Sequence, residues 1–233
     1  MKFYKILRED ENHYWLQYHT GRVDDPNEFR EDGSCVPGGI YLAPVTTILA
    51  FAYIGPWIRE VTIPEDAQMV QDPGEGPEKY RASSVVLRER ERWYNPVIIQ
   101  RLIDEGADVH AQDDYILRWA ADDGNTEIVE VLLDAGADVH VCDDEALCWS
   151  ARKGHTEVVQ MLLEAGADVH AQYDYALRWA AENRHLDVVK LLIEHGADVR
   201  VLESYLRIWV RQKTHKDIAA YLKACTKLNE EDK

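Results

Sequence analysis

Histidine is the residue in this sequence whose spacing first suggests chemistry, because it carries protons and is a common metal ligand. It recurs at thirty-residue intervals as His110, His140 and His170. If each thirty-residue stretch forms one layer of structure, these histidines lie too far apart to share a metal ion. For this column we favour local hydrogen bonding in a turn over a pH switch.

Cysteine offers no better site. The four cysteines include no CxxC pair, and Cys142 and Cys148 lie six residues apart without a third or fourth ligand in phase. We predict ordinary thiols in a reducing compartment, with no metal and no cofactor. No P-loop, dinucleotide fingerprint or Ser/His/Asp arrangement occurs in the sequence. These observations favour a non-enzymatic function.

Composition narrows the class further. The 233 residues are 46% apolar and 30% charged, as expected for a folded chain. The net charge of -17 argues against a nucleic-acid or anionic-membrane binder, because phosphate contacts need clustered Lys and Arg.

Membrane insertion and secretion are both disfavoured. The first ten residues meet charges before any apolar stretch long enough for a signal peptide. Residues 33–58 carry no charge and are long enough to span a membrane, but Pro44, the Thr46-Thr47 pair and the Gly55-Pro56 pair interrupt them. We expect a cytoplasmic protein.

The second half of the chain is an internal repeat. Gly-Ala-Asp begins at Gly106 and returns every thirty residues up to Gly196. Tryptophan keeps this phase from Trp119 to Trp209, and tyrosine keeps it in part, from Tyr115 to Tyr205. A fixed period of this length predicts stacked units, each unable to bury its apolar face alone.

Each period predicts two helices. Residues 174–183 suggest a short helix, and residues 183–196 place Leu186, Val189, Leu192 and Ile193 on one face of a second helix. Gly196 is expected to end that helix in a left-handed conformation. The break between the two helices is expected at Gly124, Gly154 and the Asn183-Arg184 pair.

Two segments resemble ankyrin repeats, residues 124–138 and 154–168. Each begins with Gly-Asn/His-Thr-Glu-Ile/Val-Val and ends with Gly-Ala-Asp, and the resemblance covers about residues 95–226. Two features depart from the family pattern. The period is thirty residues instead of about 33, and the Thr-Pro-Leu-His opening is replaced, for example by Tyr-Ile-Leu-Arg. The missing residues fall at the projecting finger, which should be a short turn. Such shortened repeats resemble those of giant DNA viruses of amoebae, as does the amino-terminal region.

The predicted fold is an α+β domain followed by an all-α ankyrin solenoid. The division is a small α+β domain of unknown function at 1–88 and an array at 89–233. Within the array we expect a half repeat at 95–107, full repeats at 108–137, 138–167 and 168–197, and a cap at 198–226. For the first domain we expect a helix at 44–53, an Arg/Glu-rich helix before Trp93, and strands at 3–7, 14–18, 39–42, 57–63 and 83–87.

The resemblance implies a non-enzymatic module that binds a host or viral protein through its concave surface. Residues 95–175 hold 4 basic and 18 acidic side chains, a net charge of -14, so a basic partner would be attracted. A solvated surface that only keeps the protein soluble is the alternative. The tryptophans are predicted to pack between layers, with exposed edges available as anchors. The candidate partner contacts are Asp114, Arg118, Trp119, Asp144, Trp149, Asp174, Arg178 and Trp179.

A rival hypothesis concerns the first domain. Residues 39–43, Gly-Ile-Tyr-Leu-Ala, resemble a segment of ADP-ribosyltransferases in which the tyrosine stacks on the nicotinamide of NAD. This resemblance would give Tyr41 that role. His19-Thr20-Gly21 would stand for the family's histidine motif, with its residues in a different order, and Glu60 or Glu65 for its glutamate. An NAD-dependent transferase targeted by the repeats is therefore the alternative function. The partner's identity and the oligomeric state are not specified by the sequence.

Overall fold

The computed structural model describes residues 1–13, 16–29, 39–212 and 214–231. The predicted strand residues 14–15, and residues 33–38 of the long uncharged segment, lie outside this description. Two compact units, Met1–Ile116 and Leu117–Lys233, divide the chain. Each is described by itself below.

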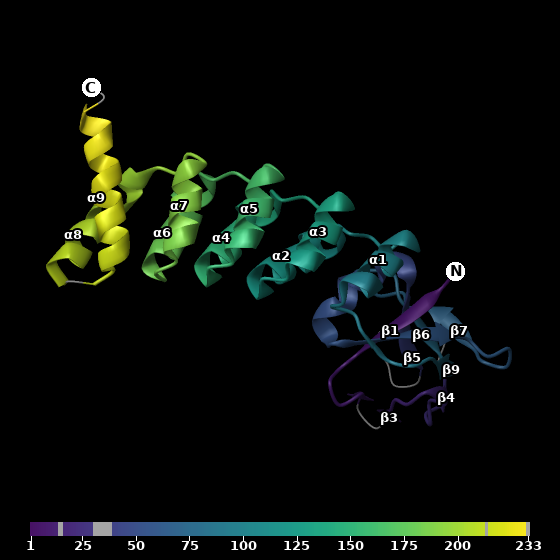
Figure 1. The fold of residues 1–233 in the computed structure, drawn as a ribbon. Helices are drawn as coiled ribbons and strands as arrows, with labels where there is room; N and C mark the ends of the chain where they lie inside the picture. The colour runs from purple at the N-terminus through teal and green to yellow at the C-terminus, as the bar shows by residue number, and fades with distance from the viewer. Residues whose placement is uncertain (14–15, 30–38, 213, 232–233) are drawn as a thin grey trace. The chain divides into compact units, whose positions relative to one another are not determined.

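The first unit is built on an antiparallel sheet (Figure 1). Its strands in spatial order are β4 (Gly21–Asp24), β9 (Ser84–Leu87), β6 (Trp57–Thr62), β1 (Phe3–Leu7), β5 (Ile40–Pro44), β8 (Tyr80–Ala82) and β7 (Met69–Gln71). A short strand, β10 (Glu91–Arg92), also pairs with β6, while β2 (Asn12–His13) and β3 (Leu16–Gln17) form a separate hairpin. Neighbouring strands pair in the order β6, β1, β5 and β8. Only Ser83 separates β8 from β9, and β9 pairs with β6, so this path of paired strands closes on itself.

Apolar side chains fill the interior of this sheet. The buried cluster consists of Leu7, Tyr18, Val23, Ile40, Leu42, Val61, Ala82, Val85 and Leu87. Three cations are buried beside it, and two of them contact carboxylates. Arg59 pairs with Glu11 at 2.9 Å, and Arg81 Nε lies 3.6 Å from Asp72. The third cation, Lys5, donates to the Tyr41 carbonyl oxygen at 2.7 Å and lies over the Tyr18 ring. Burial lowers the pKa of Lys5 to about 7, because the interior disfavours the ammonium form.

The predicted strands 3–7, 39–42, 57–63 and 83–87 correspond to β1, β5, β6 and β9. The helix expected at 44–53 is a 3-10 helix, η1 (Val45–Ile54), with Ile48 and Leu49 buried. The Arg/Glu-rich helix expected before Trp93 is wrong, because this segment is extended and ends in β10. Arg90 and Arg92 both lie over the Trp57 ring, at 4.3 and 4.4 Å from its centroid, an arrangement that an extended chain permits.

The first repeat helix belongs to the same compact unit as the sheet. Helix α1 (Pro96–Asp104) starts at Asn95, whose side chain accepts the Val97 amide, and has proline in its first turn as predicted. Glu105 accepts hydrogen bonds from Lys2 at 2.5 Å and from the Tyr4 hydroxyl at 2.6 Å. The half repeat predicted at 95–107 therefore packs with the sheet, while our division of the chain at residue 88 stays a prediction.

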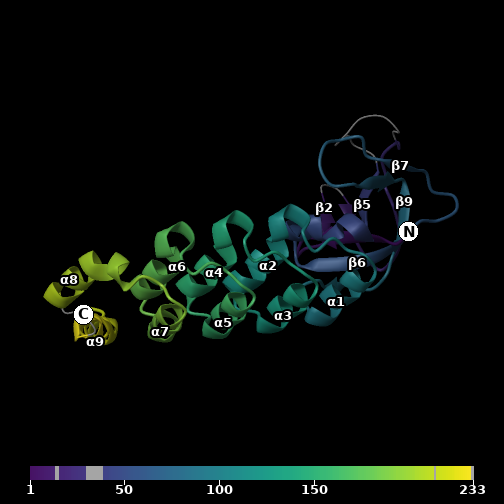
Figure 2. The same ribbon diagram turned by 90° about the horizontal axis from the view of Figure 1, so that it is seen from above.

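The second unit consists of helix pairs, as the thirty-residue period predicts. Helix α2 (Ala111–Asp123) enters it and is followed by α3 (Thr126–Asp134), α4 (Val141–Lys153), α5 (Thr156–Glu164), α6 (Ala171–Glu182), α7 (Leu186–Glu194), η2 (Val199–Leu202), α8 (Glu203–Gln212) and α9 (Lys216–Glu231). Helices α4 and α6 lie side by side in one row, and α3, α5 and α7 form a second row, as the view in Figure 2 shows.

Packing between layers follows the small and branched residues of each helix. In α7 the fully buried residues are Val188, Val189 and Leu192, while Leu186 and Ile193 are half-buried at the edges of the predicted face. Ala146 and Ala180 have at most traces of exposed surface, which lets α4 and α6 approach closely. The second unit is therefore a stack of helix pairs in two rows, with a continuous apolar seam between the rows.

Candidate functional site

Each of the three full repeats has, near its start, three consecutive residues in the left-handed conformation, none of them glycine. In the second full repeat these are Cys142, Asp143 and Asp144, with φ of 53°, 57° and 57°. The same turn occurs at 112–114 and 172–174. This conformation costs a non-glycine residue about 1–2 kcal/mol, so contacts elsewhere must hold the turn. The short turn predicted in place of the projecting finger is thus a left-handed one.

A buried aspartate at the third position holds this turn. Asp144 Oδ1 accepts two hydrogen bonds. One comes from the His140 ring nitrogen Nδ1 at 3.1 Å, and the other from the main-chain amide of Asp168, in the next repeat, at 2.8 Å. Asp174 repeats both contacts with His170 at 3.0 Å and Asp198 at 2.8 Å. An ionised carboxylate only accepts, so Nδ1 of each histidine donates. The carboxylate joins its turn to the following layer.

The histidine column makes local hydrogen bonds, as predicted. His110, His140 and His170 each bond the aspartate four residues later through Nδ1, the first at 3.2 Å from Asp114. No group of three or more His, Cys, Asp or Glu side chains that could hold a metal ion occurs among the residues with described positions.

The three predicted aspartates therefore lie inside the array. Asp114, Asp144 and Asp174 are 2%, 5% and 6% exposed, and contact between them and a partner stays a prediction. Negative charge reaches the surface at the preceding position instead, where Asp113 and Asp143 are exposed. The equivalent residue of the third repeat is Tyr173, which is 88% exposed.

The tryptophan column lies at the edge of the seam. Trp119, Trp149 and Trp179 are half-buried, and Trp209 is buried. The Trp179 ring lies 4.1 Å from that of Tyr175, and the guanidinium of Arg152 in the preceding repeat lies 4.9 Å from its centroid. The Trp179 ring therefore packs against the preceding repeat, and Trp119, Trp149 and Trp179 keep part of their surface open.

Arg118 and Arg178 occupy one phase on the first helices. Arg118 Nη1 lies 2.7 Å from the Glu145 carboxylate in the next repeat, with its side chain mostly buried. Arg178 donates to the Gln172 carbonyl oxygen at 3.0 Å and lies over the Tyr175 ring. Both guanidinium groups are thus fixed in position, as a preformed contact surface requires.

A second histidine column was missed by the sequence analysis. The Nε2 atoms of His155, His185 and His215 lie 3.0, 3.0 and 3.1 Å from carbonyl oxygens 33 residues earlier, and they donate because a carbonyl only accepts. Gly154 makes room for the second of these rings, since a Cβ there would lie 2.4 Å from His185 Nδ1. The thirty-residue spacing of these histidines was the available signal.

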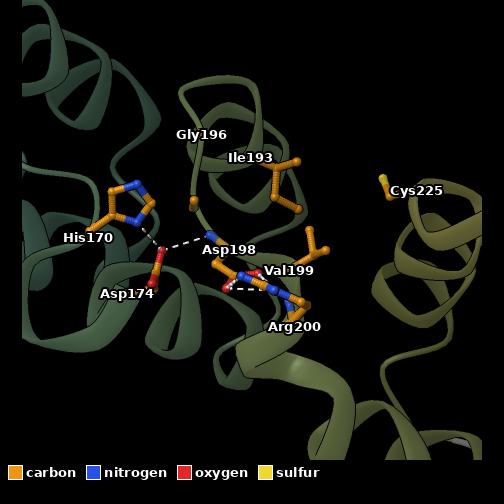
Figure 3. A pocket seen from close by; sticks show the side chains of 9 residues that line it. His170, Asp174, Ile193, Gly196, Asp198, Val199, Arg200 and Cys225 are labelled. Atoms are coloured by element: carbon orange, nitrogen blue, oxygen red, sulfur yellow. Dashed lines mark hydrogen bonds and ion pairs between the residues drawn. The ribbon is translucent and has the colours of Figure 1, made fainter. Parts of the chain in front are cut away.

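Two hollows open along the repeats. The first, of about 640 Å³, is lined by residues that include His170, Asp174, Asp198, Arg200 and Cys225. Figure 3 shows the chain of contacts on its wall, from His170 through Asp174 to the Asp198 amide, while Arg200 bonds the Asp198 carboxylate.

The second hollow, of about 720 Å³, lies between the left-handed turns of the second and third repeats. Its lining includes Asp143, Asp168, Gln172, Tyr173 and Arg178. Exposed carboxylates and an exposed aromatic ring therefore border the same space.

The residues of the rival hypothesis lie in the first unit. Tyr41, on β5, has Lys79 and Arg81 near its ring, at 5.6 and 6.0 Å from the centroid. Glu60, on β6, lies 3.6 Å from Arg88, and Glu65 is exposed. His19 Nδ1 lies 3.0 Å from the Thr20 carbonyl, and the Thr20 hydroxyl donates to Glu89 at 3.2 Å. An NAD-dependent reaction at these residues stays a prediction.

No helix in the described ranges is both long enough and apolar enough to span a bilayer.

Comparison with known proteins agrees with the geometry of the second unit. The family model described as ankyrin repeats (3 copies) matches residues 92–173 and 117–203. An ankyrin repeat protein of Acanthamoeba polyphaga mimivirus is 38% identical over 117 residues, which cover 48% of this chain and 38% of that protein. A second from the same virus is 31% identical over 125 residues, covering 51% of this chain and 20% of the relative. A third is 28% identical over 130 residues, covering 51% and 60%.

This chain spans less than two thirds of each of these relatives. Because about half of the chain is matched, the resemblance of residues 1–88 to viral proteins stays a prediction. The repeat period, the paired helices, the glycine-terminated second helices and the family match agree over residues 92–203. This part of the chain belongs to the ankyrin-repeat family.

Proposed function

We propose that the chain is a non-enzymatic recognition module that binds a host or viral protein in the cytoplasm, through the concave face formed by the turns and first helices of its repeats. The observation that carries this proposal is that neighbouring residues of one turn have different roles, one structural and one exposed. Asp144 and Asp174 bond the neighbouring layer, while Asp143 and Tyr173 beside them face solvent. The framework is therefore constant and the exposed positions vary, as in a surface that selects a partner.

The predicted contact residues divide in the same way. In this proposal Asp114, Asp144 and Asp174 hold the turns in position. The partner lies against the open edges of Trp119, Trp149 and Trp179, with Arg118 and Arg178 beside them. Half-buried aromatic rings and fixed guanidinium groups are the residue types enriched at interface hot spots.

Affinity capture from host lysate with the full chain tests the proposal. The face variant is R118A/R178A, and the matched control is E127A/E157A, which removes two exposed charges from the second helices. We expect the wild type and the control to capture the same proteins. The face variant should fail to capture them, although its circular dichroism spectrum should match that of the wild type. Equal retention by all three chains would contradict binding at this face.

A further inference from the structure

We infer that the hollow between the turns at 142–144 and 172–174 binds a basic, extended segment of a partner protein, with a lysine or arginine side chain between the Asp143 carboxylate and the Tyr173 ring. This inference rests on the proposed function and specifies the chemistry of the partner at one place on that face. The hollow has a volume of about 720 Å³, enough for several side chains.

Tyr173 is the first reason. Its side chain is 88% exposed although it is a large aromatic residue, and its backbone is left-handed, with φ of 61°. A residue that combines solvent exposure with this conformation is stabilised by neither local propensity nor burial in the free chain. The aspartate contacts that hold the turn therefore also keep the Tyr173 ring presented beside the hollow.

Charge is the second reason. Asp143 and Asp168 line the hollow and are exposed, and the basic side chains of its lining are Arg178 and His170, of which His170 bonds Asp174. The Arg178 guanidinium is already placed over Tyr175, at 4.7 Å from the ring centroid, and bonds the Gln172 carbonyl oxygen. The sequence from 95 to 175, which includes Asp143 and Asp168, carries a net charge of -14, from 4 basic and 18 acidic side chains. A cationic segment is attracted to this surface, and a phosphate-bearing ligand is repelled.

The two features together select a cation on a flexible stem. A carboxylate accepts charge-assisted hydrogen bonds from Lys or Arg, and a tyrosine face attracts the same groups through its ring quadrupole. The contact of Arg178 with Tyr175 shows this pairing within the lining of the hollow. An apolar ligand would offer no hydrogen-bond donor to the exposed Asp143 carboxylate.

A peptide of alternating arginine and glycine, labelled for fluorescence anisotropy, is the probe for the full chain. We expect D143N and Y173A each to weaken its binding about three- to fivefold, the size expected for one exposed ion pair or one cation–π contact. Y173F keeps the ring and is expected to bind within about twofold of the wild type. Binding should weaken as salt is raised.

The matched control is D187N, which removes one exposed carboxylate from the second-helix row. Its effect should be smaller than that of D143N. The inference is overturned if D187N and D143N weaken binding equally, if Y173A has no effect, or if a glutamate–glycine peptide binds as well. If the arginine peptide fails while R118A/R178A still loses its captured proteins, the recognition function stands and the basic segment is excluded.

Discussion

The main-chain amide of Asp108 donates to the carbonyl oxygen of Thr46 at 3.1 Å. Two later amides at the equivalent position, those of Asp168 and Asp198, donate instead to the carboxylates of the buried Asp144 and Asp174. The 3-10 helix of the first unit thus supplies, from its backbone, the acceptor that a left-handed turn supplies later in the chain. The half repeat is thereby completed by the 3-10 helix of the first unit.

Removing residues 1–94 should therefore expose the first helix. We expect hydrogen exchange of the α1 amides to become fast in a 95–233 fragment, because Glu105 loses Lys2 and Tyr4, and Asp108 loses Thr46. Helices α5 to α7 serve as the internal control and should keep most of their protection. Protection of α1 equal to that in the full chain would show that the sheet does not support it.

The buried aspartates can be separated from the exposed ones by stability. We expect D144A to lower the free energy of unfolding by about 2–3 kcal/mol, because it removes the acceptor of the Asp168 amide and releases a left-handed turn. D144N keeps one acceptor oxygen and should cost less. D143A, in the same turn but exposed, should change stability by less than about 0.5 kcal/mol. Urea unfolding measures all three, and equal losses for D143A and D144A would contradict this role.

Two glycines with similar backbones provide a matched pair. Gly136 and Gly154 have φ of 89° and 81°, but only at Gly154 would a Cβ meet a neighbour, at 2.4 Å from His185 Nδ1. We expect G136A to cost about 1 kcal/mol from backbone strain and G154A to cost more, about 3 kcal/mol, from strain and the clash with the ring. Adding H185A to G154A should recover part of the difference in thermal unfolding. A simple sum of the two losses would exclude the clash.

Lys5 makes the stability of the first unit depend on pH. Its pKa falls from 10.5 to about 7 on folding, so the unfolded chain binds the extra proton between these values. The resulting destabilisation is complete below pH 7, lessens as the pH rises towards 10.5, and is absent above it.

Replacement of this lysine by methionine tests that dependence. K5M removes the charge and loses the hydrogen bond to Tyr41, and we expect a net gain of roughly 2 kcal/mol at neutral pH, shrinking as the pH rises. Denaturant unfolding across this range measures the difference. A gain independent of pH would show that the amine does not titrate on folding.

The cysteines should differ in reactivity. Burial raises the pKa of the Cys148 thiol to about 12, whereas Cys142 is exposed on a left-handed turn. Because the thiolate is the reactive form, iodoacetamide should label Cys142 first and Cys148 only after denaturation. Mass spectrometry of the native chain checks the order. Early labelling of Cys148 would mean that the interface between α4 and its neighbours opens readily.

The stack of helices could be predicted because its signals repeat. Apolar spacing and Gly-Ala-Asp recur in each unit, and the structure confirms the helix pairs and the glycine that ends each second helix. The left-handed turns could not be predicted, since residues such as Gln112 and Tyr173 carry no preference for that conformation. It is imposed by Asp114 and Asp174 from within the layers.

In the first unit, short-range sequence patterns predicted less of the structure. The alternation of Arg and Glu at 88–92 suggests a charged helix, but its period of two matches an extended chain whose Arg90 and Arg92 side chains both lie over the Trp57 ring. The closure of the sheet depends on Ser83, where one continuous segment passes from pairing with β5 to pairing with β6. Such long-range pairing leaves no periodic trace in the sequence.

The bonds between layers join residues a fixed distance apart along the chain, 24 positions from Asp144 to Asp168 and 33 from Arg152 to His185. Both partners of each of these bonds are thus encoded within one repeat and the repeat that follows it. A recombination event that duplicates or deletes thirty codons in frame leaves an equivalent residue on each side of these contacts, so the gene can change the number of layers without a compensating mutation elsewhere.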